Sequence, residues 1–381
     1  MINKSFGYIF RFLPALISTV IAFASVFPSS LERLDADIDE QINRIASLES
    51  AYSSGAVAPI DEKTIFAGDL EAELEAGIKF NELNFMATHN SYQTPSIGAT
   101  KKMYKSLSQI TFGLVSEKKV DFWSETLTQQ LNCGLRSFEL DIETFDRDGE
   151  ISFTCMHSPY FEMATSCYDF SLALKEIAMW SDNNPDHLPI TVIIEPKSSF
   201  LPLKDMKYFN IDYAKALDAV IRENLGEKLF TPADMQRGYS SFGEMRAADD
   251  WCRVKDMLGK VLILLHDCDI TEEYIEIDHS VKSQAMFPML REEDIDRDCA
   301  SIILCNDPES LLEIKEEVIS EKKIMVRTRS DKFTSVTDER REQALASGAN
   351  IVSTDYPVRT DLKPGDYVVT FGGNSTVRKA S

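Results

Sequence analysis

The chain has 381 residues, of which 44% are hydrophobic, enough for one large α/β domain or two smaller ones. Lysine and arginine number 40 against 62 aspartates and glutamates, which gives a net charge of -22 at pH 7. This charge repels nucleic-acid phosphates and anionic bilayers, so the composition argues against a nucleic-acid partner.

The first residues have the pattern of a secretory signal. Lys4 and Arg11 precede an apolar run from Phe12 to Ala24, and the run ends in small residues that fit the A-x-A cleavage pattern. The alternative is a membrane anchor, but the run is shorter than the roughly 20 residues needed to span a bilayer. We therefore expect residues 1–24 to be a cleaved signal peptide and the protein to be secreted or periplasmic.

All seven cysteines lie beyond this segment, at positions 133, 155, 167, 252, 268, 299 and 305. None of them forms a CxxC pair, so metal-thiolate and thiol-redox motifs are unsupported. An exported protein meets an oxidising compartment, which predicts one to three disulfides. Cys155 and Cys167, which flank a short loop, are the first candidate pair.

The next segment is predicted to be a helical extension followed by a linker, together covering residues 25–79. Apolar residues recur with helical spacing from Leu31 to Leu48, and the small residues of 53–59 indicate a linker. The helix has fewer than three heptads and carries Gln41 in its apolar seam, which favours packing on its own domain over self-association. We expect a monomer whose main domain covers residues 80–381.

Eight apolar, β-rich runs follow, at residues 83–87, 136–142, 151–156, 190–195, 261–265, 301–305, 323–327 and 350–353. Helical patterns separate most of them, at 125–132, 168–181, 211–225, 308–320 and 336–347. Alternating strands and helices predict parallel pairing and closure into a (β/α)8 TIM-type barrel. The barrel is expected to be distorted, because Asp148-Gly149 is a hairpin signal that would fold the third run back antiparallel on the second.

Polar motifs end four of these strands. His89-Asn90 follows the first run, Glu139 and Asp141 lie in the second, His157 follows the third and Glu195 ends the fourth. In a β/α barrel the C-terminal strand ends meet at one face, where active sites form. We therefore expect these side chains to converge although they are far apart in the sequence.

The converging side chains predict cation-assisted phosphodiester cleavage. Glu139 and Asp141 are two residues apart, so their carboxylates share one face of an extended strand. With Glu195 and the amide oxygen of Asn90 they offer the oxygen ligands that Ca²⁺ prefers. Two histidines beside such a cation could stabilise charge on the phosphoryl oxygens and protonate the leaving alkoxide.

Four motifs resemble the catalytic X region of phosphoinositide-specific phospholipases C: His89-Asn90-Ser91-Tyr92, Arg136-Ser137-Phe138-Glu139-Leu140-Asp141, the His157 strand and Ile193-Ile194-Glu195. Further motifs are similar to the secreted bacterial Ca²⁺-dependent branch: Pro196-Lys197, Asn184-Pro185-Asp186-His187-Leu188-Pro189, Arg327-Thr328-Arg329-Ser330-Asp331 and Ser353-Thr354-Asp355-Tyr356-Pro357. The resemblance covers about residues 80–370. It implies a phosphatidylinositol-type lipid substrate, met at a membrane surface, and one Ca²⁺ ion.

The resemblance also implies a role for each matching residue. Its calcium ligands correspond to Asn90, Glu139, Asp141 and Glu195. His89 would stabilise the pentacoordinate phosphorus, and His157 would be the general acid on the diacylglycerol oxygen. The inositol 2-hydroxyl would attack phosphorus, deprotonated by Glu139 or Glu195, and a cyclic inositol phosphate would form first.

Candidate substrate-binding residues end three of the strands. Lys197 lies two residues beyond Glu195 and could contact inositol or phosphate oxygens, although a surface lysine after a proline turn is the alternative. Arg327, Asp355 and Tyr356 end the last two predicted strands, where contacts to ring hydroxyls are expected.

Other interpretations remain open. A glycerophosphodiester phosphodiesterase shares the barrel and paired acids but usually begins His-Arg-Gly, whereas Asn90 follows His89 here. A non-catalytic phosphoinositide-headgroup binder is a second alternative, although no candidate histidine or ligand is missing. His266, Asp267 and Asp269 could form a second metal site, and the stretch 101–123 could contact a membrane, although a packed loop is the favoured interpretation.

Overall fold

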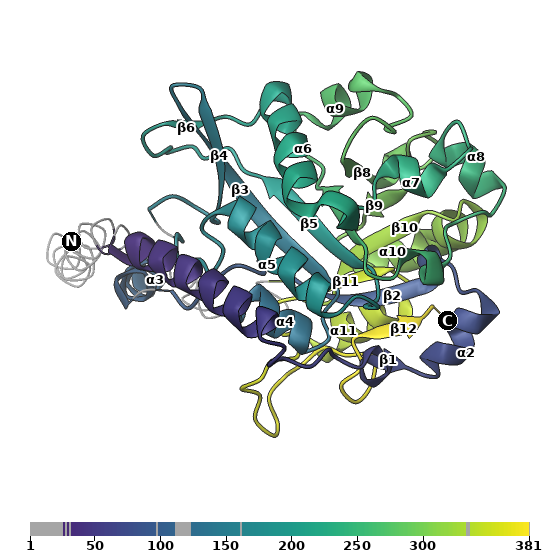
Figure 1. The fold of residues 1–381 in the computed structure, drawn as a ribbon, viewed down its shortest axis with the longest axis horizontal. Helices are drawn as coiled ribbons and strands as arrows, with labels where there is room; N and C mark the ends of the chain where they lie inside the picture. The colour runs from purple at the N-terminus through teal and green to yellow at the C-terminus, as the bar shows by residue number, and fades with distance from the viewer. Residues whose placement is uncertain are drawn as a thin grey trace, which may run out of the picture.

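The fold is a closed barrel of eight parallel strands surrounded by helices, as the computed structural model shows (Figure 1). The structure describes residues 26, 29, 32–96, 98–110, 123–160, 162–332 and 336–380, so the predicted signal at 1–24 lies outside it. Hydrogen bonds between β2 and β3 close the ring. In order around the barrel the strands are β2 (Leu83–Thr88), β3 (Ser137–Arg147), β5 (Ile190–Pro196), β7 (Val261–Leu265), β8 (Met286–Arg291), β9 (Ile302–Leu304), β10 (Met325–Arg329) and β11 (Ile351–Thr354).

The predicted TIM-type barrel and the predicted antiparallel fold-back of the third run on the second are confirmed, but one barrel strand was missed. The third run forms β4 (Glu150–Cys155), which pairs antiparallel with β3 outside the barrel, after the tight turn at Asp148-Gly149. The missing barrel strand is β8, in register between β7 and β9. Its sequence is short and contains Pro288, which lacks a backbone N–H and therefore weakens a strand prediction.

Helices fill the crossovers between strands. All five predicted helices are present, and each begins at a side-chain cap; Asp169, for example, accepts a 3.0 Å hydrogen bond from the Leu172 N–H at the start of α5. Beyond Lys315, α10 continues as a π-helix over Glu316–Glu321. The helices are α2 (Leu70–Ala76), α3 (Gly98–Ile110), α4 (Leu127–Asn132), α5 (Phe170–Asn183), α6 (Ile211–Leu225), α7 (Pro232–Gln236), α8 (Phe242–Ala247), α9 (Thr271–Ile277), α10 (Pro308–Lys315) and α11 (Asp338–Ala346).

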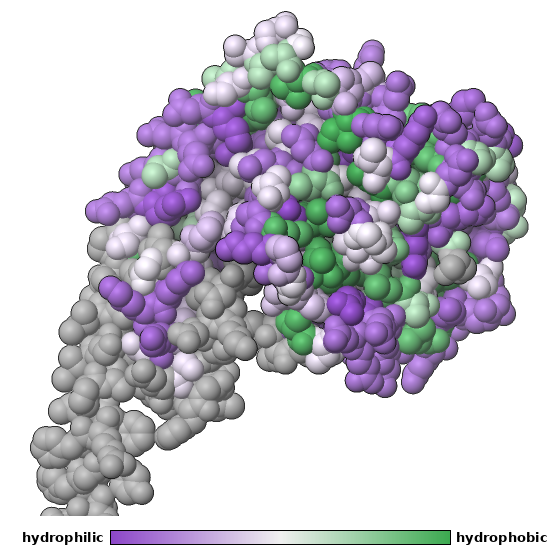
Figure 2. Space-filling model, turned by 90° about the horizontal axis from the view of Figure 1, so that it is seen from below, coloured by the Kyte–Doolittle hydropathy of each residue, from purple (hydrophilic) through white to green (hydrophobic). Residues whose placement is uncertain are grey.

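One continuous hydrophobic core fills the barrel and the layer beneath its helices. The barrel strands are largely buried, as expected where both faces of a parallel sheet are covered; every residue of β7 is apolar and buried. Short strands extend the sheet: β1 (Phe66–Ala67) pairs with β12 (Val377–Lys379), and β6 (Met206–Lys207) pairs with β3. Polar and charged residues cover much of the face in Figure 2, with apolar residues scattered among them.

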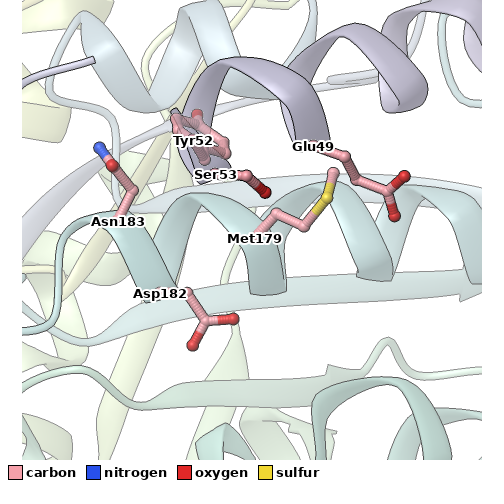
Figure 3. A pocket seen from close by; sticks show the side chains of 6 residues that line it. All are labelled: Glu49, Tyr52, Ser53, Met179, Asp182 and Asn183. Atoms are coloured by element: carbon pink, nitrogen blue, oxygen red, sulfur yellow. The ribbon is translucent and has the colours of Figure 1, made fainter. Parts of the chain in front are cut away.

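The predicted N-terminal helix is confirmed over 32–53, and it packs on its own domain, alongside α5 (Figure 1). Gln41 exchanges two hydrogen bonds with the backbone of Asp169, at 2.9 and 2.8 Å. Arg44 forms a 3.0 Å ion pair with the buried Glu176 of α5. Figure 3 shows a pocket between the end of this helix and the end of α5, lined by Glu49, Tyr52, Ser53, Met179, Asp182 and Asn183.

The predicted disulfide is wrong, because all seven cysteines are free thiols. Cys155 and Cys167 are both fully buried, and burial raises the pKa of each thiol, that of Cys167 to about 12.

One residue of the stretch considered for membrane contact, Trp123, is half-buried, and the Arg359 guanidinium lies 4.7 Å from its ring centre. Phe112, Leu114 and Phe122 lie outside the described residues. Within the described chain, no helix combines the length and hydrophobicity needed to cross a membrane.

Candidate active site

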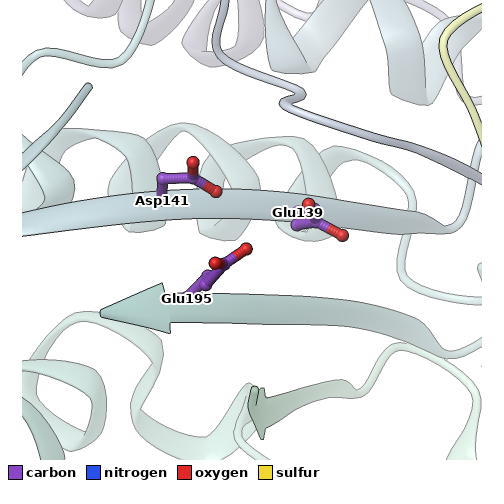
Figure 4. Close-up of side chains that lie close together, drawn as sticks. All are labelled: Glu139, Asp141 and Glu195. Atoms are coloured by element: carbon purple, nitrogen blue, oxygen red, sulfur yellow. The ribbon is translucent and has the colours of Figure 1, made fainter. Parts of the chain in front are cut away.

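Three carboxylates meet at the C-terminal end of the barrel strands. Glu139 and Asp141 project from the same face of β3, and Asp141 is in register with Glu195 on the adjacent β5 (Figure 4). One oxygen from each lies within 4.8 Å of the others. Glu139 is 1% exposed and Asp141 is fully buried, so two negative charges are held out of water at one point.

Two basic side chains balance this charge. Arg327 Nη2 donates to Glu139 Oε2 at 2.5 Å, and Lys197 Nζ lies 2.5 Å from Glu195 Oε1 and 3.1 Å from Asp141 Oδ2. Burial disfavours each carboxylate anion. At Glu139 the charge of Arg327, together with the other basic side chains around it, outweighs burial and lowers the pKa to about 2. Lys197 likewise lowers the pKa of Glu195. For Asp141 burial dominates, and its pKa is raised.

Asn90 supplies a fourth oxygen beside this cluster. It follows β2 in a left-handed conformation with φ +46°, which asparagine tolerates better than most residues. Its Oδ1 and Asp141 Oδ1 are buried without a hydrogen-bond partner among the described residues, whereas Asp141 Oδ2 has the ion pair with Lys197. Such oxygens are costly unless something pairs with them. A hard cation bound by oxygen ligands fits this arrangement, since Ca²⁺ prefers carboxylate and amide oxygens.

His89 contacts this cluster from the end of β2. Its Nδ1 lies 2.7 Å from Asp355 Oδ1, and its Nε2 lies 3.3 Å from Glu139 Oε1 and 3.1 Å from Arg329 Nη1. Arginine can only donate, so a hydrogen bond from Arg329 requires a bare Nε2 and places the ring proton on Nδ1, facing Asp355. His89 and Arg329 together lower the pKa of Asp355 against the opposing effect of burial.

His157 follows β4 and lies near enough to the cluster for its charge to act on Asp141. Its Nδ1 lies 2.6 Å from Glu162 Oε2, and its side chain is 40% exposed. Burial lowers its pKa, but the hydrogen bond and charge of Glu162, together with the charge of Asp141, outweigh burial and raise it. The ring therefore tends to hold its proton, as a general acid requires.

Arg327 and Asp355 occupy positions that sequence spacing alone does not specify. The Arg327 side chain is 2% exposed and donates to Glu139, Asn306 and Ser353. Asp355 holds His89, whereas Tyr356 packs edge-on against Tyr367 with ring centres 5.1 Å apart. No hydrogen bond or ion pair among the described residues joins the Tyr356 side chain to the four candidate ligands.

The R327M variant should be strongly destabilised. It would leave the buried Glu139 without its Arg327 partner, and breaking a buried ion pair costs about 3–5 kcal/mol. Urea unfolding followed by circular dichroism measures the change. R291M removes an exposed ion pair with Asp267 and should leave the unfolding midpoint nearly unchanged. Equal midpoints for both variants would contradict this assignment.

Sequence reasoning missed three residues that support the site. Glu162 holds His157, and Glu143 lies two residues beyond Asp141 on β3, where burial raises its pKa to about 6. Asp331 is fully buried and accepts hydrogen bonds from Ser330, Thr354 and the Asp355 N–H. Two-residue spacing from Asp141 could have flagged Glu143, and the motif at 327–331 already contained Asp331. No local pattern marks Glu162.

The suggested second metal site at 266–269 does not form. Asp267 pairs with Arg291 at 2.5 Å, and His266 Nδ1 faces the carbonyl of Asp267 at 2.9 Å. Among the described residues, Glu139, Asp141 and Glu195 make up the cluster with ligand atoms close enough to hold a metal. A positive charge on His266 would lower the pKa of both Glu139 and Glu195, so this ring faces the main cluster.

Comparison with known proteins agrees with this geometry. The family model for Ca²⁺-dependent phosphoinositide phospholipase C matches residues 144–380. A calcium-dependent phosphoinositol-specific phospholipase C from Pseudomonas sp., solved as a myoinositol complex, is similar over 80% of this chain and 96% of its own, with TM-score 0.52 and 17% identity. The Ca²⁺-dependent phosphatidylinositol-specific phospholipase C of Streptomyces antibioticus covers 73% of this chain and 95% of its own, with TM-score 0.51 and 16% identity.

A comparison with curated protein sequences finds no match. The structural matches establish the barrel fold, and the family model covers more than half of the chain, including His157, Glu195 and Lys197. The carboxylate cluster agrees with the calcium dependence of that family. The chain therefore belongs to the Ca²⁺-dependent phosphoinositide phospholipase C family and is an enzyme of the phosphoric diester hydrolase class.

Proposed function

We propose that the enzyme cleaves phosphatidylinositol-type lipids by attack of the inositol 2-hydroxyl on phosphorus, which releases diacylglycerol and a cyclic inositol phosphate. The observation that carries the proposal is the buried carboxylate cluster, with His89 in contact with Glu139 and His157 near enough for its charge to act on Asp141. A base, an acid and a cation site at one strand-end face are what this displacement needs.

The proposed calcium ligands are Asn90, Glu139, Asp141 and Glu195. Bound calcium supplies positive charge that stabilises the transition state and lowers the pKa of the attacking hydroxyl. Of the two candidate bases, Glu139 is held by Arg327 with a pKa of about 2, which makes it a weak base. The Glu195 side chain is 26% exposed against 1% for Glu139, and substrate can therefore reach it, so we propose Glu195 as the base.

The two histidines divide the remaining work. Asp355 orients the His89 ring through Nδ1. The Nε2 that accepts from Arg329 here would donate to a phosphoryl oxygen only in the doubly protonated ring, so the proposed role requires His89 to carry a proton on each nitrogen when substrate is bound. Glu162 holds Nδ1 of His157, which leaves Nε2 to donate the proton to the diacylglycerol oxygen. Without that proton the departing alkoxide would be a poor leaving group.

The remaining proposed roles concern substrate binding. Lys197, Asp355 and Tyr356 would contact the inositol ring or phosphate, and Arg327 would act through Glu139, which it holds in place.

Residues 1–24 remain our proposed signal peptide, and we expect a secreted or periplasmic monomer. Sequencing the N-terminus of exported protein tests the cleavage.

The K197M variant should bind calcium more tightly. Lys197 now pairs with two of the proposed ligands, so it competes with the ion and repels it. Removing one charge at this distance should tighten calcium binding about tenfold or more. Calorimetry measures the affinity, and the exposed-lysine variant K204M should match the wild type. If K197M binds calcium more weakly than the wild type, Lys197 supports the ion site instead of competing for it.

Phosphorus NMR of phosphatidylinositol vesicles tests the proposed reaction. With calcium present, the lipid phosphodiester resonance should give way to a five-membered cyclic phosphate, and calcium chelation should stop the conversion. Absence of the cyclic phosphate, with cleavage of glycerophosphoinositol supplied as a second substrate, would contradict it and would favour a glycerophosphodiesterase. A protein that binds vesicles but leaves the resonance unchanged would be a headgroup binder.

A further inference from the structure

The loop that follows β5 carries the most exposed apolar side chains of the described chain. Phe200 is 91% exposed, Leu201 55% and Tyr208 65%. A soluble protein rarely leaves a phenylalanine almost wholly in water, whereas single exposed aliphatic residues such as Ile277 and Leu312 are ordinary. We call the segment 199–208 the apolar loop.

The structure holds the apolar loop in place by its inner side. Met206 is buried in a small hydrophobic cluster with Met156 and Met163, and Leu203 packs against that cluster. Met206 also pairs with Phe145 of β3 through the short strand β6. Because these inner residues anchor the loop, Phe200 and Leu201 are held outward instead of collapsing onto the core.

The apolar loop is continuous with the active site. It begins two residues after Lys197, and its Ser199 hydroxyl donates to Glu143. On its far side, the Tyr160 hydroxyl donates to the Pro202 carbonyl at 3.2 Å, and Tyr160 lies three residues beyond His157. Figure 1 shows β4 and β6 extending together beyond the barrel. The exposed tip therefore stands beside the proposed acid, at the end of the barrel where substrate would enter.

We infer that Phe200, Leu201 and Tyr208 dock the enzyme on the lipid–water interface of a phosphatidylinositol-containing bilayer. This inference rests on the proposed function, because only a lipid substrate requires the site to meet a bilayer. Phe200 and Leu201 would enter the acyl boundary, while the phenol of Tyr208 would stay at the headgroups, where amphipathic aromatic rings accumulate. The exposed Lys204 and Lys207 would face lipid phosphates.

The overall charge strengthens the case for apolar contact. At -22 the chain is repelled by anionic lipid, so two lysines alone cannot bring it to the membrane. Binding must then depend mainly on the apolar side chains. Vesicle binding should accordingly persist at high salt, and it should be sensitive to polar substitution of Phe200 and Leu201.

Local insertion is tested with the F200W variant in vesicles of phosphatidylcholine and phosphatidylinositol that carry brominated acyl chains. The added indole should shift its emission to the blue and be quenched by bromine, after subtraction of the wild-type signal. The I277W variant places an indole at an exposed site on α9 and should show neither effect. Equal behaviour of the two variants would overturn the inference.

Sedimentation with the same vesicles gives a second test. The F200S/L201S double variant should bind about tenfold or more weakly than the wild type, because two inserted apolar side chains are lost, whereas I277S/L312S should bind like the wild type. Equal binding of all three proteins would overturn the docking role.

Both tests measure binding without turnover. Vesicles bound through Phe200 but not cleaved would therefore refute only the proposed function, and cleavage with unaltered F200S/L201S binding would refute only the docking role.

Discussion

The D141N variant is expected to lose about 10³-fold or more in activity while its fold becomes no less stable. Asparagine matches the shape of aspartate but removes one of the charges on which calcium binding depends. Asp141 is fully buried, and burial raises its pKa, so its charge is unfavourable in the metal-free protein. D141N gives up the ion pair with Lys197, but it also removes a burial cost that outweighs this pair, so function is lost while stability is kept.

Three measurements on D141N check this expectation: calcium affinity by calorimetry, turnover of phosphatidylinositol, and urea unfolding in chelator. The matched control is D331N, which changes another fully buried acid. Asp331 accepts hydrogen bonds from Ser330, Thr354 and the Asp355 N–H, so D331N should lose stability yet keep calcium binding. If D141N unfolds more readily than the wild type in chelator, Asp141 is a structural acid and not a cation ligand.

The H157N variant is expected to lose about 10²–10⁴-fold in turnover, the range typical of a positioned general acid. The loss should depend on the leaving group. A diacylglycerol alkoxide needs the proton, whereas a nitrophenolate departs without it, so a nitrophenyl phosphodiester of inositol should show a much smaller loss. The H279N variant changes an exposed histidine and should behave as the wild type. Equal losses on both substrates would exclude His157 as the acid.

The same role predicts a pH dependence. A general acid acts while protonated, so activity should fall as the pH rises through the pKa of His157. Glu162 and Asp141 raise that pKa against the effect of burial, which places the falling limb above the usual histidine value of about 6.5. The E162Q variant removes the larger of these two effects and should move the limb to lower pH. A limb that stays in place would contradict the pairing of Glu162 with His157.

The barrel could be predicted from the sequence because apolar β-rich runs and helical segments alternate regularly along the chain. The hairpin signal at Asp148-Gly149 also predicted that residues 151–156 return antiparallel along β3, as they do, although their composition is that of a barrel strand. The prediction failed at one barrel strand. Residues 286–291 do form a barrel strand, although Pro288 argues against one. The count of eight was therefore right with one member exchanged.

At the site, the residues at strand ends could be predicted from the sequence, but the contacts between residues far apart in the chain could not. Strand ends locate Asn90, Glu139, Asp141 and Glu195, because the barrel brings those ends together whatever lies between them. Partners far apart in sequence could not be read from spacing. Glu139 and Arg327 are 188 positions apart, and only the closed barrel joins them. Their pairing alters the chemistry, since it makes Glu139 a weak base.

The Cys155–Cys167 disulfide was expected from short spacing and the assumption of export. Spacing allows two cysteines to meet, but side-chain direction decides whether they bond. Here both thiols are buried in the core on either side of the His157 loop and remain free. The loop is held instead by the N-terminal helix, whose Asp37 accepts a hydrogen bond from the Thr165 N–H at 3.0 Å.

The most direct test of the central claim is one calcium titration in which binding heat and phosphatidylinositol cleavage are followed under the same conditions. The carboxylate cluster predicts one ion per chain, half-saturation of binding and of activity at the same calcium concentration, and neither in the D141N variant. Cleavage that continues at full rate in excess chelator would contradict the claim. Calcium binding that D141N leaves intact would place the ion elsewhere.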